Sequence, residues 1–295
     1  MVKHWIEAIR PRTIPVSLSG VLAGTVCAIV NDSFSLVPAL LCLLFAALAQ
    51  IASNFANEYF DYKNGIDHQG RAGFRRAVTE GDITPSAMKY ATYGTLMCAA
   101  IVGCILLLYG EWWMIFVGIV VVLAALGYSA GPFPLSHNGL GDIAVIIFFG
   151  IVPVTLTCYL QQSCLESFYI SMPTSVAIGL LAANVLVVNN YRDMEDDEDA
   201  DKMTTVVIFG RKRMGRYYLI SGFIAMAFMI PLLEEMPAIA ISAPVLYLAM
   251  HTITWRKVIR SSGAELNPLL GATARNLLVF TLLLLAFAII GSVSC

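Results

Sequence analysis

The dominant feature of this sequence is a succession of long apolar runs separated by short polar connections. A helix needs about 20 apolar residues to cross the ~30 Å hydrocarbon core of a bilayer. Such runs occur at nine places, at about 14–31, 35–57, 88–109, 112–130, 141–161, 172–190, 216–233, 237–254 and 273–294. We therefore expect an all-α, polytopic membrane protein with nine transmembrane helices. No soluble linker separates the runs, so the sequence predicts one transmembrane domain over residues 1–295.

The composition also indicates that this chain lies in a lipid bilayer. Hydrophobic residues make up 58% and charged residues only 13%, whereas a soluble domain carries about 25% charged residues. The net charge of −2 provides no basic field that would attract nucleic acid, and we expect no such partner. The seven cysteines show no metal-binding spacing, so we expect them to pack as small apolar residues.

The 18 Lys and Arg residues are confined to alternate connections between the apolar runs. They precede the first run, follow the second and the sixth, and lie between the eighth and the ninth. Excess positive charge marks the cytoplasmic side of a membrane protein. The pattern predicts a multi-pass protein of the cytoplasmic (inner) membrane, with its N-terminus in the cytoplasm and its C-terminus outside. It also requires an odd number of spans.

Two apolar runs end in stripes of amides and carboxylates on the predicted cytoplasmic side. In NFANEYFDYKNGID, which closes the second run, Asn54, Asn57, Glu58 and Asp61 share one helical face, and Asp67 follows Gly65. In NNYRDMEDDEDADKMT, which closes the sixth, Asn189, Asp193 and Asp197 recur every four residues, with Lys202 soon after. The alternative interpretation is a solvated helix end, which suits the irregularly spaced Glu195, Asp196, Glu198 and Asp199 better than the two matching stripes.

Carboxylates at a membrane edge are costly unless they are paired, solvated or bound to a cation. Hard oxygen ligands on two facing helices suit Mg²⁺, which keeps several waters and shares its remaining positions with substrate phosphates. The spacing excludes an EF-hand, because Glu198 and Thr204 stand where its Gly and its final Glu are needed. Arg192 and Lys202 lie within the second stripe, and Arg76 follows the first. Carboxylates, cations and a divalent metal together predict a site for a diphosphate.

These two motifs resemble the two aspartate-rich motifs of the UbiA superfamily of intramembrane prenyltransferases. AIRPRTIP, RRAVTEGDIT, YSAGPFPLSHNGLGD and LNPLLGATARN are similar to the branch that acts on 1,4-dihydroxy-2-naphthoate in menaquinone biosynthesis. The resemblance implies nine helices around a central cavity that opens on the cytoplasmic side. It also implies Mg²⁺ as cofactor and a polyprenyl diphosphate and a hydroxynaphthoate as substrates. The polyprenyl group would be transferred to the naphthoate with loss of CO₂ and diphosphate.

The resemblance and the residue pattern together give a set of candidate site residues. We expect catalytic roles for Asp61, Asp67, Asp193, Asp197 and Lys202, and Mg²⁺ ligands in those four aspartates and Glu58. Glu58 replaces an aspartate of the family motif and Asp201 replaces an expected glycine, so the roles of both are open. The candidate substrate-binding residues are Asn54, Asn57, Arg76, Tyr128, Asn189, Asn190, Arg192 and Arg12. Arg10 and Arg12 are candidates for the acceptor carboxylate, although an Arg before a first span is also a topology signal.

Three other functions compete with this interpretation. A prenyltransferase for 4-hydroxybenzoate or another aromatic acceptor would carry similar motifs. A cation-coupled transporter would place its acidic residues near the bilayer midplane, often in broken helices, whereas here both stripes lie at one edge. A membrane scaffold without catalysis leaves the matching stripes unexplained. His137, in the connection after the fourth run, is either a base or a solvated loop residue. The oligomeric state and the length of the prenyl chain are open.

Overall fold

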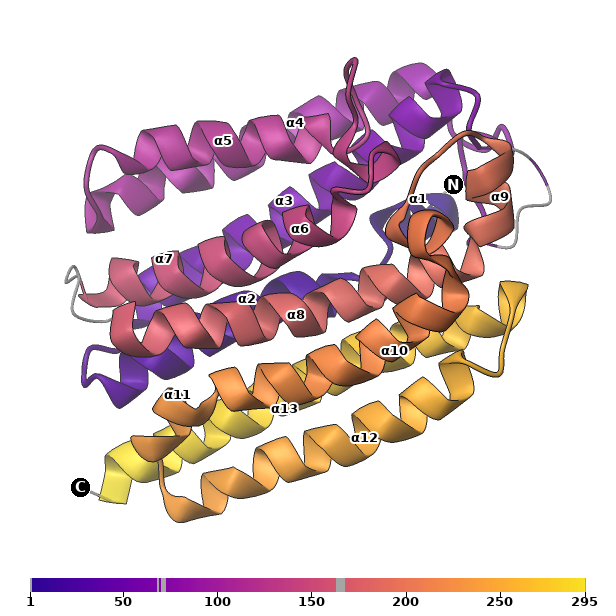
Figure 1. Cartoon of the computed structure of the whole chain (residues 1–295). Helices are drawn as coiled ribbons and strands as arrows, with labels where there is room; N and C mark the ends of the chain where they lie inside the picture. Colours follow the sequence, from indigo (N-terminus) through magenta and orange to yellow (C-terminus); the bar gives the residue numbers. More distant parts are fainter. Residues whose placement is uncertain (1, 68, 70–72, 163–167, 295) are drawn as a thin grey trace.

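The computed structural model of the chain describes residues 2–67, 69, 73–162 and 168–294 (Figure 1). Cys295, which the topology prediction places outside the cell, lies outside the described residues. The described residues form helices without any strand, apart from one isolated bridge between Asn138 and Met203. The elements of the first half are α1 (Val2–Ile9), α2 (Ile14–Val30), α3 (Leu36–Lys63), α4 (Pro85–Leu106), η1 (Leu107–Tyr109), α5 (Met114–Gly127), η2 (Leu135–His137), α6 (Gly141–Val145), η3 (Ile146–Ile151) and α7 (Val152–Gln162). Those of the second half are α8 (Phe168–Arg192), α9 (Met194–Asp199), α10 (Thr205–Phe228), α11 (Ile230–Glu234), η5 (Ala238–Ile241), α12 (Ser242–Val258), η6 (Gly263–Leu266) and α13 (Asn267–Ser294). The predicted all-α class is confirmed.

Every predicted span is helical, but not every one meets the requirements of a span. Six helical segments are long and apolar enough to cross a membrane, or seven if the bent pair α1 and α2 forms one span. The predicted segment 112–130 gives only 14 helical residues in α5. The segment 216–233 is divided between α10 and α11, and α10 begins at Thr205, bends at Gly210 and includes a basic stretch. The number of nine spans therefore remains a prediction.

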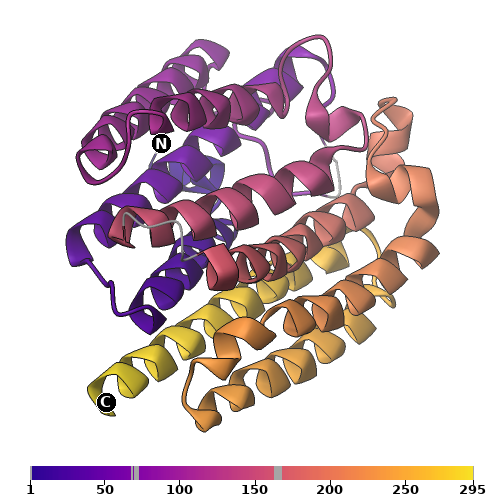
Figure 2. The same cartoon turned by 60° about the vertical axis from the view of Figure 1, so that its left-hand side comes forward.

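Helix α8 is the centre of the bundle. It lies between α10, α12 and α13 on one side and α4 and α5 on the other (Figures 1 and 2). Gly179 of α8 meets Gly150 of η3 so closely that a Cβ on Gly150 would lie 2.4 Å from the Cα of Gly179. Small residues at such crossings let two membrane helices approach each other closely.

The helices lie roughly along one direction, so the bundle has two ends (Figure 1). Helices α1 and α9 lie at one end, and α13 finishes at the other. Local sequence signals position the elements of the first end. Thr204 caps α10 by accepting a hydrogen bond from the amide of Val207, and Thr84 caps α4 in the same way through Ala87. The connections that carry the acidic motifs are thereby held between fixed helix ends.

Candidate active site

The end of α3 brings two carboxylates of the first motif to one guanidinium. Arg76 Nη2 lies 3.6 Å from Asp61 Oδ2, and Arg76 Nε lies 3.2 Å from Asp67 Oδ2. Asp61 and Asp67 are both buried. Gly65 has a φ of +70° between them, a conformation that costs glycine little and lets the chain turn back. Asp61, Asp67 and Arg76, all predicted site residues, therefore form one cluster.

The other polar residues of the first motif contact the surrounding protein. The Asn54 amide nitrogen donates to the carbonyl of Ile9 at 2.8 Å, and Gln50 donates to the Asn54 side-chain oxygen at 3.0 Å. Glu58 accepts from the backbone amide of Val78 at 3.1 Å. The bond from Asn54 to Ile9 holds the end of α1 against α3, and the bond from Val78 to Glu58 holds the segment after the motif there. Asn57 accepts from the Ser129 hydroxyl at 2.7 Å, so it connects α3 to the residue after Tyr128.

The second motif pairs Asp193 with its sequence neighbour Arg192. The guanidinium donates from Nε to Oδ1 and from Nη2 to Oδ2, both at 2.7 Å, and the pair is almost completely buried. Arg192 also donates to the side-chain oxygens of Asn189 and Asn267, each at 2.9 Å. A two-point guanidinium–carboxylate contact of this kind is strong and fixes the orientation of both groups. Asn267 begins α13, so this network joins the two helices.

Asp197 and Lys202 form the second ion pair of this motif. Lys202 Nζ lies 3.0 Å from Asp197 Oδ1, and the Lys202 amide donates to the Asp197 carbonyl at 2.8 Å. Burial by itself would lower the pKa of Lys202, but the carboxylates of Asp197, Asp61 and Asp193 raise it. Lys202 therefore stays charged, and it is influenced by carboxylates of both motifs, Asp61 of the first and Asp193 and Asp197 of the second. Asn190, the second residue of this motif, is also buried.

The segment between α5 and α6 joins the two motifs. His137 Nε2 lies 4.0 Å from Asp61, while the His137 carbonyl accepts from the Met203 amide at 3.0 Å, one residue after Lys202. Burial and the nearby charge of Lys202 lower the pKa of His137 to about 4, so the ring is neutral at pH 7. The solvated alternative for His137 does not fit, because its side chain is only 16% exposed. The two acidic motifs thus meet around Lys202 and this segment.

A ring of Phe74 connects the cations of two separate elements. The guanidinium carbon of Arg12 lies 4.6 Å from the ring centroid, and that of Arg192 lies 5.1 Å from it. Both distances suit a cation–π contact. Arg12 is exposed, and it lies within the break between α1 and α2, where Arg10 has a φ of +55°. Arg12 therefore reaches the edge of the acidic site rather than its centre.

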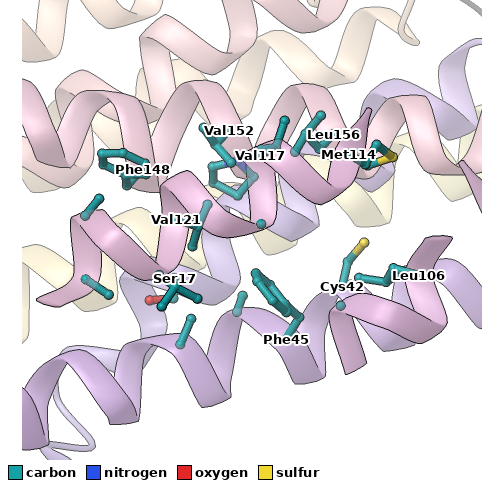
Figure 3. Close-up of a pocket in the computed structure, with 18 of the residues that line it drawn as sticks. Ser17, Cys42, Phe45, Leu106, Met114, Val117, Val121, Phe148, Val152 and Leu156 are labelled. Atoms are coloured by element: carbon teal, nitrogen blue, oxygen red, sulfur yellow. The ribbon is translucent and has the colours of Figure 1, made fainter. Parts of the chain in front are cut away.

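An apolar cavity of about 450 Å³ lies inside the first half of the bundle. It is lined mainly by aliphatic and aromatic side chains of α2, α3, α4, α5, η3 and α7, among them Phe45, Val121, Phe148 and Leu156 (Figure 3). Tyr128 also lines it, and the charges of Asp142, Asp61 and Asp197 act on the Tyr128 hydroxyl. Tyr128 is therefore the point at which the apolar cavity meets the charged cluster.

The donor set fits a magnesium ion that is shared with a phosphorylated ligand. Within the described ranges, no three His, Cys, Asp or Glu side chains lie close enough to hold a metal ion by themselves. Mg²⁺ in proteins is commonly held by one or two carboxylates together with waters and substrate phosphates. Asp61 and Asp67 at one motif and Asp193 and Asp197 at the other are buried carboxylates of the required kind. Glu58 is accounted for by its bond to Val78 without a metal.

The structure adds residues that the sequence did not single out. Asn267 contacts Arg192, and Phe74 lies against Arg192 and Arg12. The only sequence signal for Asn267 was its place in LNPLLGATARN, and Phe74 had none. Asp142, in the first turn of α6, accepts a hydrogen bond from the Thr205 hydroxyl. Such contacts join residues that lie far apart in the chain, so no local pattern reports them.

The fold and the site define an integral membrane protein of the all-α class whose buried charged cluster adjoins a long apolar cavity. The chain belongs to the UbiA prenyltransferase family, which it matches over residues 17–277. The resemblance seen in the two acidic motifs is thereby confirmed.

The relatives of this chain include several curated enzymes. It is 34% identical over 283 residues to a 1,4-dihydroxy-2-naphthoate octaprenyltransferase of Mycobacterium tuberculosis, covering 95% of this chain and 94% of the relative. It is 36% identical over 225 residues to an enzyme of the same name from Haemophilus influenzae, covering 74% and 72%. A UbiA homolog from Archaeoglobus fulgidus, solved with GPP and Mg²⁺, has the same fold, with a TM-score of 0.70 at 18% identity and coverage of 99% and 100%.

Proposed function

We propose that this protein transfers a polyprenyl group from a polyprenyl diphosphate to 1,4-dihydroxy-2-naphthoate, with release of CO₂ and diphosphate. The product would be of the demethylmenaquinone type, which places the reaction in menaquinone biosynthesis. Relatives that are 34% and 36% identical carry the name of this activity. The observation that carries the proposal is the meeting of the two acidic motifs around Lys202, directly beside the apolar cavity at Tyr128. A polyprenyl diphosphate needs a charged site for its diphosphate and an adjoining apolar cavity for its polyprenyl chain.

The charged cluster would bind the diphosphate. Lys202, Arg76 and Arg192 are cations held near the carboxylates of both motifs. We assign Asp61, Asp67, Asp193 and Asp197 as the residues that would hold Mg²⁺. When bound, Mg²⁺ would neutralise the charge that gathers on the leaving diphosphate. Lys202 and Arg76 would donate hydrogen bonds to the same oxygens, because fixed donors stabilise charge that develops in a dry site.

The apolar cavity would bind the polyprenyl chain and protect the reacting carbon. Cleavage of the allylic C–O bond leaves the electron pair on the diphosphate and a positive charge on the prenyl group. Phe45, Phe148 and Tyr128 line the cavity and exclude water from that charge. An electron-rich ring carbon of the acceptor then forms the new C–C bond. Because the carboxylated ring can adopt a β-keto-acid tautomer, it loses its carboxylate as CO₂.

The acceptor would enter at the edge of the charged cluster. Arg12 is the candidate for its carboxylate, since the exposed guanidinium is held over Phe74 beside Arg192. Asn57 and Asn189 would orient the head groups through their amides, and the buried Asn190 stays a candidate substrate-binding residue. Asn54 would act indirectly, because its amide holds the carbonyl of Ile9.

We also propose the orientation of the protein in the cytoplasmic membrane. The helix ends that carry the acidic motifs would face the cytoplasm, together with α1, and α13 would end outside. Nine crossings, with α5 and α10 as two of them, would satisfy the confinement of the 18 Lys and Arg residues to one side. Residues 1–295 would form a single transmembrane domain around a cavity that opens on the cytoplasmic side.

The decisive experiment uses 1,4-dihydroxy-2-naphthoate labelled at its carboxyl carbon. Membranes that contain the protein should release labelled CO₂ in step with the formation of a lipid-soluble product. Release should require both the polyprenyl diphosphate and Mg²⁺, and chelation should stop it reversibly. Prenylation of 4-hydroxybenzoate with its carboxylate retained, and no turnover of the naphthoate, would keep the prenyltransferase activity and refute the acceptor.

A further inference from the structure

A second cavity lies between the end of α12 and the start of α13, and it shares no residue with the apolar cavity or with the acidic motifs. Its volume is about 460 Å³. Three cations of one helix end, Arg256, Lys257 and Arg260, line it together with a single carboxylate, Glu265. The formal charge of these four groups is +2. A concave site with this charge favours an anion.

The three cations have no ion-pair partner in the part of the chain that the structure describes. This distinguishes them from Arg76 and Arg192, whose guanidinium groups lie against Asp67 and Asp193. Glu265 lines the same cavity, yet it forms no ion pair with any of the three. The charge of this cavity is therefore available to a ligand.

The cavity also has an apolar side that continues along α12. Ile253 lies one turn before Arg256 and Lys257 and lines the cavity, with Leu269 of α13 opposite. Leu246, seven residues before Ile253, shares its face, and the two side chains are 47% and 55% exposed. This part of α12 belongs to a candidate membrane span, Ala238–Val258. The cations therefore lie at the end of a span, where apolar side chains give way to charged ones.

We propose that this cavity binds the phosphate of an anionic phospholipid head group, with its acyl chains along Ile253, Leu269 and Leu246. Basic pockets between membrane helices at the membrane surface bind anionic head groups. Confinement of positive charge to one side accounts for the presence of cations, but it requires neither a cavity nor an apolar wall below them. A soluble anion would use the cations and leave the exposed apolar side chains without a role.

The test uses the full chain in detergent micelles and native mass spectrometry with two lipids of identical acyl chains. Phosphatidylglycerol should be retained roughly tenfold better than phosphatidylcholine, because each cation near a head group adds to the binding. The variant Arg256→Gln/Lys257→Gln/Arg260→Gln should lose that preference. The matched control is Lys212→Gln/Arg213→Gln/Arg216→Gln, which removes the same charge from exposed residues of α10 that do not line the cavity.

A gain of binding provides a test that misfolding cannot imitate. Glu265→Gln raises the charge of the cavity and should increase phosphatidylglycerol retention severalfold, and a decrease would overturn the proposal. Equal loss of preference in both triple variants would show a diffuse surface effect and would also overturn it. So would displacement of the lipid by millimolar inorganic phosphate or diphosphate, because the site would then be one for a soluble anion.

Discussion

The two acidic helix ends carry similar sequence patterns, but their side chains do different things. At the end of α3, Asn54 and Glu58 bind backbone groups of other segments, Ile9 and Val78. At the end of α8, Asp193 binds Arg192, its neighbour in sequence. The first motif therefore uses Asn54 and Glu58 to hold other segments of the protein around the site. The second motif pairs its buried aspartates with its own cations, and Arg192 also contacts Asn267 of α13.

The two motifs also differ in how their carboxylates share cations. Asp61 and Asp67 share Arg76, so either can be lost while the guanidinium keeps a partner. Among the described residues, Arg192 forms an ion pair only with Asp193. Loss of Asp193 would leave a buried guanidinium with amide acceptors alone. Equivalent positions in two similar motifs should therefore differ in stability even where they agree in activity.

Asp193→Ala should have the largest effect, on both activity and stability. Removal of Asp193 leaves the buried guanidinium of Arg192 without its counter-charge, which should lower the free energy of unfolding by about 3 kcal/mol. Turnover should fall by roughly 10²–10³-fold, as for the loss of one group that stabilises developing charge. CO₂ release in nanodiscs and the midpoint of thermal unfolding measure the two effects. An active or fully stable variant would contradict the assignment of this pair.

Asp61→Ala should separate the two effects. Turnover should again fall by roughly 10²-fold, because a carboxylate at the meeting point of the motifs is lost. The unfolding midpoint should stay much closer to that of the unmodified protein than for Asp193→Ala, because Arg76 keeps Asp67. A loss of stability as large as that of Asp193→Ala would break the comparison between the two motifs.

Glu58 offers a matched pair of variants. Glu58→Gln keeps an oxygen that can accept from the Val78 amide, so activity should stay within about tenfold of the unmodified protein. Glu58→Ala leaves that buried amide without its acceptor and should cost about 1–3 kcal/mol of stability. If Glu58→Gln were as inactive as Asp61→Ala, Glu58 would be a direct ligand of the metal after all.

The smallest effect should come from Glu195, on the outer side of the second motif. Its carboxylate pairs with Arg211, but the side chain is 66% exposed. Exposed ion pairs contribute about 0–1 kcal/mol. Glu195→Gln should therefore leave turnover and the unfolding midpoint nearly unchanged under the assays used for Asp193→Ala. A large loss of turnover would mean that the charged site extends beyond the buried stripe.

Several features of this protein could be predicted from its sequence because they depend on local periodicity and on the surrounding solvent. The length of the apolar runs predicted the helices. The single helical face expected for Asn189, Asp193 and Asp197 is interrupted, because α8 ends at Arg192 and α9 begins at Met194. Confinement of Lys and Arg to alternate connections predicted one common end for both motifs, and α1 and α9 lie at the same end of the bundle. Asp61, Asp67 and Arg76 lie in contact with one another, and their roles in metal and substrate binding stay predictions.

Tertiary structure alone decided what each side chain of the motifs contacts. Helical spacing gives the direction of a side chain from its own axis, but the group that fills that direction comes from another segment. Val78 satisfies Glu58, Asn267 satisfies Arg192, and His137 approaches Asp61 from the loop before α6. These partners lie between 20 and 76 residues away in the chain. Whether a carboxylate holds the fold or faces a substrate is therefore decided by how the helices and loops dock, because docking determines which buried groups already have a partner.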